Sequence, residues 1–345
     1  MFGGISLSGL ISYLSGRRLV GSILYVAVAC ALIIICTFKG IGSDQDSVAY
    51  LKYFNLSDYA MTQVAEPTFI LISNISRFFS ADRGIVVLFF FYALIGVTIK
   101  FYAIGTLTEL KWLSVLTYFS TYFLLHEFTQ IRVAVASGLL LVSLRYVLER
   151  RPGQFALCVA IASLFHYSAL LAAPLYFLST SSLDSKQKFA IALAIPAGLI
   201  FYIFKFNIIY AIPIELVRSK IAIYTEVESL RSVKINVFNI VYLFKYMLLY
   251  VFLIFSGVIS KNSPYFPILL KVYAISMFAY LALSFNTAFA MRISELFGVV
   301  EIILIPLLFY AIKPRIVAVV LVVAIAAANL ALGVFQTELI QQAAW

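Results

Sequence analysis

Long apolar runs recur along the whole chain, and they determine the predicted architecture. The runs at residues 19–38, 84–100 and 316–334 carry no charged side chain except Lys100 at the end of the second run. A helix of roughly 20 apolar residues is long enough to cross the hydrocarbon core of a bilayer. The short alternating segments typical of a membrane β-barrel are missing. The pattern therefore predicts an all-α fold, a polytopic bundle of transmembrane helices.

We predict about eleven spans, within a range of about 10–12, on the criterion of apolar length. They are placed at residues 19–38, 84–103, 112–126, 131–149, 153–165, 168–180, 189–206, 238–259, 266–285, 296–312 and 315–333. The apolar segment 67–80 is short and is interrupted by Asn74 and Arg77. We expect an outer-face or re-entrant helix there, because counting it as a span would reverse the side of every later loop.

The consecutive segments 153–165 and 168–180 are also short, at about 20 Å each for a rise of about 1.5 Å per residue. A break between them is tolerated at membrane depth only where protein or a water-filled cavity surrounds the backbone. One long span over 153–179 is the alternative, and it would place Lys186 outside. The charge of the loops favours the broken pair.

The composition supports a membrane protein and excludes most soluble classes. Hydrophobic residues make up 63% of the 345 residues and charged residues 12%, with a mean hydropathy of +1.04, which is far from the values of soluble domains. We expect a single integral domain over residues 1–345, with the first run retained as a span. The cysteines Cys30, Cys36 and Cys158 lie in apolar runs, and their spacing suggests neither disulfides nor a metal site.

The net charge of +10 is explained by the side on which the basic residues fall. With the N-terminus inside, the bases on one face far outnumber the acids Glu109, Glu149 and Asp184, as expected for a cytoplasmic face. These bases are Arg17, Arg18, Lys100, Lys111, Arg145, Arg150, Arg151, Lys186, Lys188, Lys261, Lys271, Lys313 and Arg315. The longer loops, 39–83 and 207–237, then lie outside. The basic charge therefore reflects topology, and we expect no nucleic-acid partner.

Three ionisable residues from distant parts of the chain are predicted at the outer ends of spans. Arg132 follows Gln130 at the start of one span, His166 lies at the break between the two short spans, and Arg292 precedes the span at 296–312. Charged groups near hydrocarbon are costly and usually face a bundle interior or a wet cavity, so they are functional candidates. The alternatives are that the arginines reach lipid headgroups and that a backbone carbonyl satisfies His166.

Other polar residues in the apolar segments have more ordinary interpretations. His126 lies among aromatic residues and is expected to be structural. Lys245 is close to the outer face, where it would extend toward the membrane surface or contact a lipid phosphate. Glu295 would share a helix face with Arg292 and orient it. Glu301 lies deeper in the same span and has no obvious partner in the sequence.

Four segments between residues 42 and 306 form an ordered set of motifs. They are Asp46 to Tyr50 with Phe54 and Glu66 to Phe69, then Phe128 to Ala136, then Leu164 to Leu170 with Pro174, and finally Arg292, Glu295, Phe297 and Leu304 to Pro306. This set resembles the bacterial polysaccharide polymerases of the Wzy/EpsG type, which include polymerases of O-antigen and exopolysaccharide. One departure is the presence of two acids, Asp44 and Asp46, where the family usually has one.

The resemblance implies a multi-pass glycosyltransferase of the bacterial inner membrane, with an active site that faces the periplasm. It would polymerise oligosaccharide repeats carried on undecaprenyl diphosphate into O-antigen, capsule or exopolysaccharide, without a cofactor, nucleotide sugar or metal ion. Membrane lipids, a chain-length regulator and a flippase are the implied partners. A lipid-linked oligosaccharide flippase or transporter and an O-antigen ligase are the alternative functions. A flippase would favour two similar halves, and we find no internal repeat.

Residue chemistry assigns roles within this resemblance. Arg132 and Arg292 would bind the diphosphate leaving group through their guanidinium groups. His166 is the first candidate for the general base and Asp46 the second. A single displacement would invert the anomeric carbon. The candidate substrate contacts are Gln130, Asp44, Tyr50, Glu66, Tyr167, Glu295 and Lys245.

Overall fold

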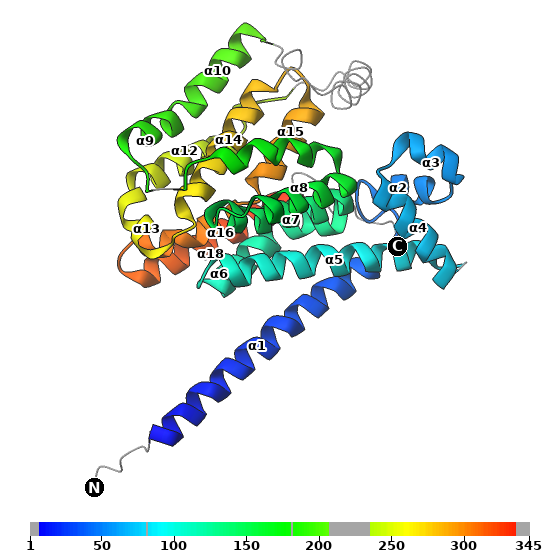
Figure 1. The fold of residues 1–345 in the computed structure, drawn as a ribbon, viewed down its shortest axis with the longest axis horizontal. Helices are drawn as coiled ribbons and strands as arrows, with labels where there is room; N and C mark the ends of the chain where they lie inside the picture. Colours follow the sequence, from blue (N-terminus) through cyan, green and yellow to red (C-terminus); the bar gives the residue numbers. More distant parts are fainter. Residues whose placement is uncertain (1–6, 81, 181, 207–234, 336–345) are drawn as a thin grey trace.

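The computed structural model describes residues 7–80, 82–180, 182–206 and 235–335, and every regular element in these ranges is helical. The first helix, α1 (Leu7–Thr37), extends diagonally from the body of the bundle (Figure 1). Its C-terminal part packs on α5 (Gly84–Leu107), where the Tyr25 hydroxyl donates to the Phe101 carbonyl at 2.8 Å.

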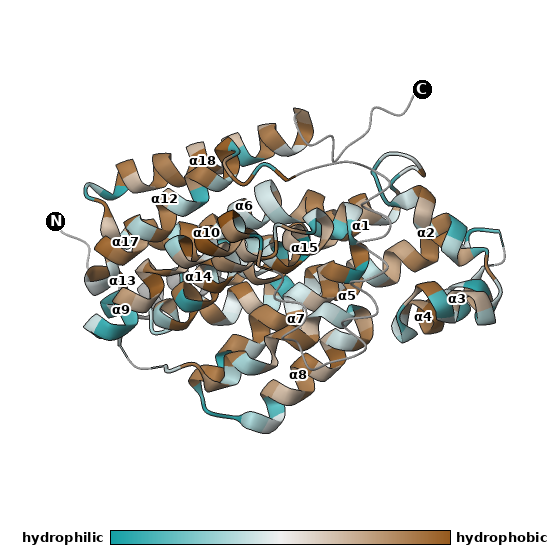
Figure 2. Cartoon of the chain, turned by 90° about the horizontal axis from the view of Figure 1, so that it is seen from above, coloured by the Kyte–Doolittle hydropathy of each residue, from teal (hydrophilic) through white to brown (hydrophobic). Residues whose placement is uncertain are grey.

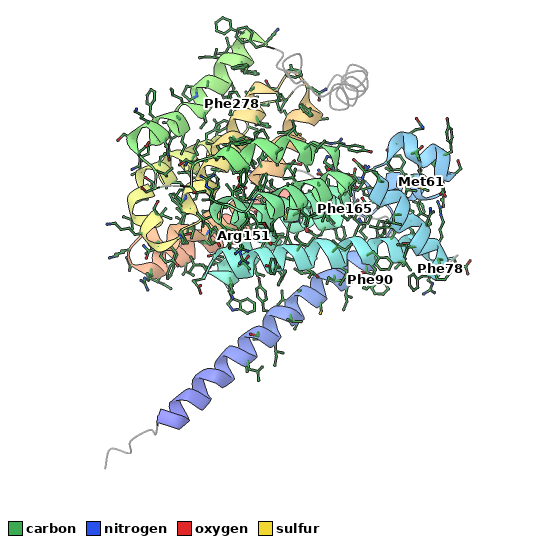
Figure 3. The ribbon with its side chains drawn as sticks, in the orientation of Figure 1. Met61, Phe78, Phe90, Arg151, Phe165 and Phe278 are labelled. Atoms are coloured by element: carbon green, nitrogen blue, oxygen red, sulfur yellow. The ribbon has the colours of Figure 1, made fainter. Side chains whose placement is uncertain are left out.

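Three short helices form a group at one end of α5 (Figure 1). They are α2 (Ser47–Phe54), α3 (Asp58–Val64) and α4 (Pro67–Phe79). The Ser57 side chain accepts a hydrogen bond from the Ala60 backbone and starts α3, and a proline in the first turn starts α4, as both residue types commonly do. Figure 3 shows Phe165, at the end of α8 (Pro152–Phe165), near this group, which contains Met61. The helix predicted over 67–80 is therefore present as α4.

The central helices α5, α7 (Ile131–Leu148) and α8 (Pro152–Phe165) pack side by side. Glycine permits the close approach of α5 and α7. A Cβ atom added to Gly138 would lie 3.0 Å from Cγ2 of Ile99 and 3.4 Å from Cγ of Lys100. Small residues at helix contacts are a common means of close packing in membrane proteins.

Two unusual helices flank this central group. The short α6 (Lys111–Thr117) continues directly into a π-helix, η1 (Tyr118–Thr129), which ends just before α7. After α8, the backbone is extended at His166 and the chain returns along α8 as a 3₁₀ helix, η2 (Tyr167–Phe177). The predicted break at this position is thus confirmed, and a single continuous helix over 153–179 is wrong.

The second half of the chain is built around the buried helix α14 (Phe266–Ala282). The helix α10 (Ala194–Phe204) packs closely on it. A Cβ atom added to Gly198 would lie only 2.8 Å from Cβ of Leu281, which shows how closely the two helices approach at this glycine. Helix α18 (Arg315–Phe335) lies along one side of the bundle and is largely apolar (Figure 2). The remaining elements are α9 (Ser185–Ala192), α12 (Ile240–Ile254), α13 (Ser256–Asn262), α15 (Thr287–Gly298), α16 (Glu301–Leu304), η4 (Ile305–Leu307), α17 (Leu308–Ala311) and α18 (Arg315–Phe335).

Among the described residues, five helices are long and apolar enough to cross a membrane. The number rises to seven if two bent pairs each count as one span, α12 with α13 at 75° and α15 with α16 to α17 at 42°. Helices occur at all the predicted span positions, but several are too short or too broken to meet this criterion. The all-helical fold is therefore confirmed, whereas the count of about eleven spans is not.

The assignment of charges to the two membrane faces places Lys100 in a cytoplasmic loop, and the structure shows that this is wrong. Lys100 lies within α5, which continues to Leu107, and its side chain is fully buried. Its ammonium group pairs with the buried Glu127 carboxylate and donates to the Ala134 carbonyl at 2.8 Å. A buried charge needs such a partner.

Most of the predicted outer loop 207–237, namely residues 207–234, lies outside the described residues.

Candidate active site

Arg132 lies at the junction of η1 and α7 and faces the α2–α4 group. Hydrogen bonding from the Ala134 backbone to the Gln130 carbonyl at 3.0 Å begins α7, which places Arg132 in its first turn. The guanidinium group donates to the Glu66 carboxylate. Its central carbon lies 5.6 Å from the ring centre of Tyr50 and 5.9 Å from that of Phe69. Arg132 thus contacts protein groups, which contradicts the headgroup alternative.

Glu66 connects Arg132 to His166. One carboxylate oxygen accepts from Arg132, and the other lies 3.2 Å from Nδ1 of His166. The Glu66 side chain is only 8% exposed. Burial alone would raise its pKa, but Arg132 and His166 reverse that effect and lower the pKa to about 2. Glu66 is therefore an ionised group that fixes two candidate catalytic side chains.

His166 is positioned by the end of α8 and by α4. Its backbone N–H closes the last turn of α8 on Ala162 at 2.9 Å, and the Thr68 hydroxyl donates to the nearby Leu164 carbonyl at 2.7 Å. The ring pairs with Glu66, so the alternative of a backbone carbonyl partner is wrong. A carboxylate at Nδ1 favours the tautomer with its proton on that atom. Nε2 is then the nitrogen able to accept a proton.

The two aspartates of the first outer loop differ in their surroundings. One oxygen of the buried Asp44 accepts from the backbone N–H groups of Asp46 at 2.9 Å and Ser47 at 2.8 Å. Its other oxygen lies 3.0 Å from Nζ of the buried Lys39. Asp44 therefore stabilises the start of α2. The Asp46 side chain is only half-buried and does not cap α2.

Asp46 lies in the field of both candidate arginines. Burial raises the pKa of the Asp46 carboxyl, while Arg292 and, less strongly, Arg132 oppose the rise. The charges of the same two arginines also reach His166. Arg292 is half-buried in α15 and acts on Glu295 as well. The structure thus brings together the groups that were predicted to converge from distant parts of the chain.

A hydrogen bond joins the two arginine-bearing helices. Nε2 of Gln130 donates to a carboxylate oxygen of Glu295 at 3.3 Å. Gln130 precedes α7 and Glu295 lies in α15, one turn after Arg292. This contact fixes α15 against the start of α7. Tyr167, which follows His166, is half-buried, and the charge of Glu66 reaches its hydroxyl.

Lys245 and Glu301 form an ion pair that the sequence did not reveal. Nζ of Lys245 lies 3.0 Å from each carboxylate oxygen of Glu301, and the Tyr122 hydroxyl donates to one of them at 3.1 Å. The Glu301 side chain is 2% exposed. The expectations that Lys245 extends to the membrane surface and that Glu301 has no partner are therefore wrong.

Lys39 is a further polar residue of this region that sequence reasoning missed. Its ammonium group donates to the Phe128 carbonyl at the end of η1 and pairs with Asp44. Burial lowers the pKa of Lys39, and Asp44 opposes the shift. The available signal was a lone lysine directly after the first apolar run. Lys39 links α1, the first outer loop and η1.

His126 is fully buried in η1, where Nδ1 lies 3.1 Å from the Ser137 hydroxyl and the ring packs against Tyr122. It precedes Glu127 of the Lys100–Glu127 pair, and the charges of Lys100 and His166 reach its ring. Within the described ranges, no group of three or more His, Cys, Asp or Glu side chains could hold a metal ion.

Comparison with protein families identifies a relationship that covers most of the chain. A family model described as the EpsG family matches residues 22–342. Searches of curated proteins and of solved structures found no significant match. The matched region includes every segment that carried the resemblance as well as all the site residues described above. The chain therefore belongs to the EpsG family, which is consistent with a polysaccharide polymerase.

Proposed function

We propose that this protein is a membrane glycosyltransferase that polymerises oligosaccharide repeats carried on a lipid diphosphate, at the periplasmic face of the bacterial inner membrane. The observation that carries the proposal is that Glu66 contacts both Arg132 and His166, while the charges of Arg132 and Arg292 both reach His166 and Asp46. Membership of the EpsG family supports the reaction class.

The reaction is a single displacement at the anomeric carbon of the donor sugar. A hydroxyl oxygen of the acceptor repeat attacks this carbon and forms the new glycosidic bond. The bond from the carbon to the diphosphate oxygen breaks, and the lipid diphosphate leaves with the electron pair. The proton of the attacking hydroxyl passes to a protein base. Because negative charge grows on the diphosphate, fixed cations near it lower the barrier.

Arg132 and Arg292 are suited to bind that leaving group. A guanidinium group has five N–H donors in a planar fork that matches phosphate oxygens. Arg132 uses part of its fork on Glu66 and lies among the aromatic rings of Tyr50 and Phe69, so its position is set before substrate binds. Arg292 approaches the same region from α15, which Glu295 and Gln130 connect to the start of α7.

His166 is the base that the contacts favour. Glu66 at Nδ1 orients the ring and stabilises the imidazolium that forms when Nε2 takes a proton, as carboxylates do in other acid–base pairs. Asp46 is the second candidate. Its raised pKa makes it a stronger base than an ordinary carboxylate.

Deletion of the gene separates this proposal from its alternatives. A polymerase deletion should leave a surface glycan that carries a single repeat. Loss of all surface repeats would instead indicate a ligase, and repeats trapped on the cytoplasmic side would indicate a flippase. Glycan profiles of whole cells and of inverted membrane vesicles distinguish the three results.

Variants then test the residues. Arg132→Ala and Arg292→Ala should abolish chain extension, and His166→Ala should lower the rate roughly 10²–10⁴-fold, as for a lost acid–base group. Arg145→Ala is the matched control, because Arg145 pairs with Glu149 at the other end of α7 at 2.5 Å. Normal long chains from both arginine variants would contradict the leaving-group role. Normal extension by His166→Ala would transfer the base role to Asp46.

A further inference from the structure

A groove of about 330 Å³ lies between α12 and α18. Its walls are almost entirely apolar, with Phe244 and Leu248 on α12, Ile305 on η4, and Ala324 and Ala328 on α18. The polar side chains that line it include Lys245 and Glu301, which form an ion pair. The groove thus combines a long apolar wall with a single charged region.

The helices on the two sides of the groove belong to different packed groups. Helix α12 packs mainly on α14, α13 and α9, whereas α18 packs mainly on η1, α17 and α6. Only 22% of the α18 span is buried, and Ala324 and Ala328 are exposed. In a membrane, the groove would therefore open sideways to the lipid phase.

The Lys245–Glu301 pair and its neighbours link the groove to the candidate active site through α15. Lys245 pairs with Glu301 and its charge also reaches Glu295. Glu295 accepts a hydrogen bond from Gln130, two residues before Arg132. One turn before Lys245, the Tyr242 hydroxyl lies 2.8 Å from the Ser294 hydroxyl, next to Glu295. A lipid with its tail in the groove would thus have its head directed toward the arginines.

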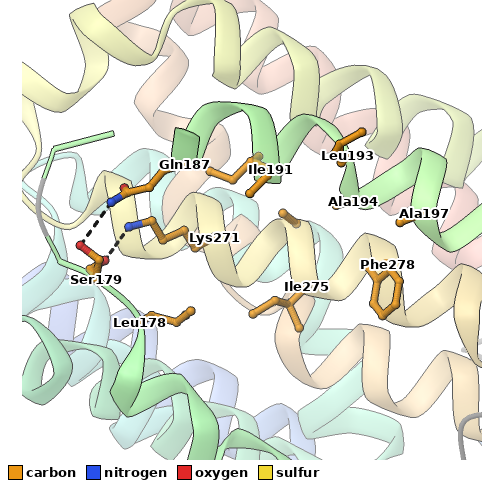
Figure 4. Close-up of a pocket in the computed structure, with 12 residues that line it drawn as sticks. Leu178, Ser179, Gln187, Ile191, Leu193, Ala194, Ala197, Lys271, Ile275 and Phe278 are labelled. Atoms are coloured by element: carbon orange, nitrogen blue, oxygen red, sulfur yellow. Dashed lines mark hydrogen bonds between the residues drawn. The ribbon is translucent and has the colours of Figure 1, made fainter. Parts of the chain in front are cut away.

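A second and larger pocket, of about 490 Å³, lacks such a link (Figure 4). It lies between α10 and α14, and its polar end is formed by Lys271, which donates to the Ser179 carbonyl at 2.6 Å, and by Gln187. None of the candidate active-site residues lines it. Its apolar surface therefore has no connection to the diphosphate chemistry.

We propose that the groove between α12 and α18 holds the isoprenoid chain of the lipid carrier while its diphosphate lies at the arginines. This inference rests on the proposed function, since it assumes a lipid-diphosphate donor. The apolar walls suit a long hydrocarbon chain. The lateral opening would allow the carrier to enter and leave without crossing the bundle.

The test is photolabelling of the purified protein in nanodiscs with undecaprenyl diphosphate that carries a diazirine on its chain. Label is expected on α12 residues 240–248 or α18 residues 324–332, with competition by unlabelled undecaprenyl diphosphate and little by phosphatidylglycerol. Ala328→Trp fills the groove and should lower the labelling about tenfold, or ~1.4 kcal/mol in affinity. Ala327→Trp is the control, because Ala327 is exposed on α18 but does not line the groove.

Ala324→Trp provides a second obstruction if Ala328→Trp accumulates poorly. Label on other helices, equal labelling of the filled and control variants, or equal competition by phosphatidylglycerol would each overturn the inference. Chain extension is measured in parallel on the same samples. The wild-type protein could show the expected label in the groove and yet make no polymer. That result would contradict the transferase proposal but support the groove as a carrier site.

Discussion

Replacing Glu66 by glutamine removes one charge and almost no volume, and it should destabilise the protein in a pH-dependent manner. The Glu66 carboxylate is buried between Arg132 and His166. Its pKa falls from the usual 4.5 to about 2 in the folded protein. At about 1.4 kcal/mol for each tenfold change in proton affinity, the ionised carboxylate contributes about 3 kcal/mol to folding.

The direction of the pH effect follows from the lowered pKa. The unfolded chain binds the Glu66 proton at a higher pH than the folded chain does, so the stabilisation is complete above about pH 4.5. It is lost as the pH falls toward about 2. Wild type should therefore be about 3 kcal/mol more stable than Glu66→Gln at neutral pH, and the difference should shrink progressively through this acidic range.

Denaturant unfolding in detergent micelles, repeated from neutral to acidic pH, measures the difference. Glu109→Gln is the matched control, because Glu109 is exposed and its replacement should change the unfolding free energy little. A constant difference between wild type and Glu66→Gln at all pH values would refute the ion-pair argument. Equal stability at neutral pH would show that Glu66 does not hold Arg132 and His166 in solution.

The remaining predictions concern a catalytic arginine, a buried ion pair and a helix contact. Arg292→Lys should lower the rate of chain extension at least about tenfold, because a point charge lacks the planar fork; a near-normal rate in a polymerisation assay would contradict a bidentate contact. Lys100→Met should cost about 3–5 kcal/mol of unfolding free energy by leaving Glu127 unpaired. Adding Glu127→Gln to this variant should restore much of the lost stability, whereas additive losses from the two substitutions would exclude an energetic coupling between Lys100 and Glu127. Gly198→Ala should lower the unfolding free energy by about 1–3 kcal/mol by crowding α14. Gly105→Ala is the control, because no atom lies near its added Cβ, and it should be neutral or slightly stabilising. Equal effects of the two substitutions on thermal unfolding would contradict the close approach of α10 and α14.

The positions of the helices could be predicted because their signals are local. The apolar run predicted as a span at 131–149 is the helix Ile131–Leu148, and the segment at 67–80 is the helix Pro67–Phe79. Apolar length and proline in the first turn act within a few residues. The number of true spans is different, since it depends on bends, breaks and depth in the bilayer that local hydropathy does not specify.

The set of candidate site residues was also accessible from the sequence, because charged residues in apolar surroundings are rare. The sequence identifies Arg132, His166 and Arg292 in this way, and in the structure the charges of both arginines reach His166 and Asp46. Their detailed roles were less accessible. The two neighbouring aspartates look equivalent in the sequence, yet Asp44 bonds to the backbone at the start of α2, while the charges of both arginines reach Asp46.

The ion-pair partners were decided only by the tertiary structure. Glu66 is separated from His166 by 100 residues, and Lys245 from Glu301 by 56. A buried charge must find an opposite charge or hydrogen bonds because the interior solvates it poorly, but that requirement does not specify which partner. Packing of α4 on α8 brings Glu66 to His166, and the approach of α12 to α16 brings Lys245 to Glu301. The sequence alone thus determined that this chain forms apolar helices with a few costly charges, and the fold determined which of those charges meet.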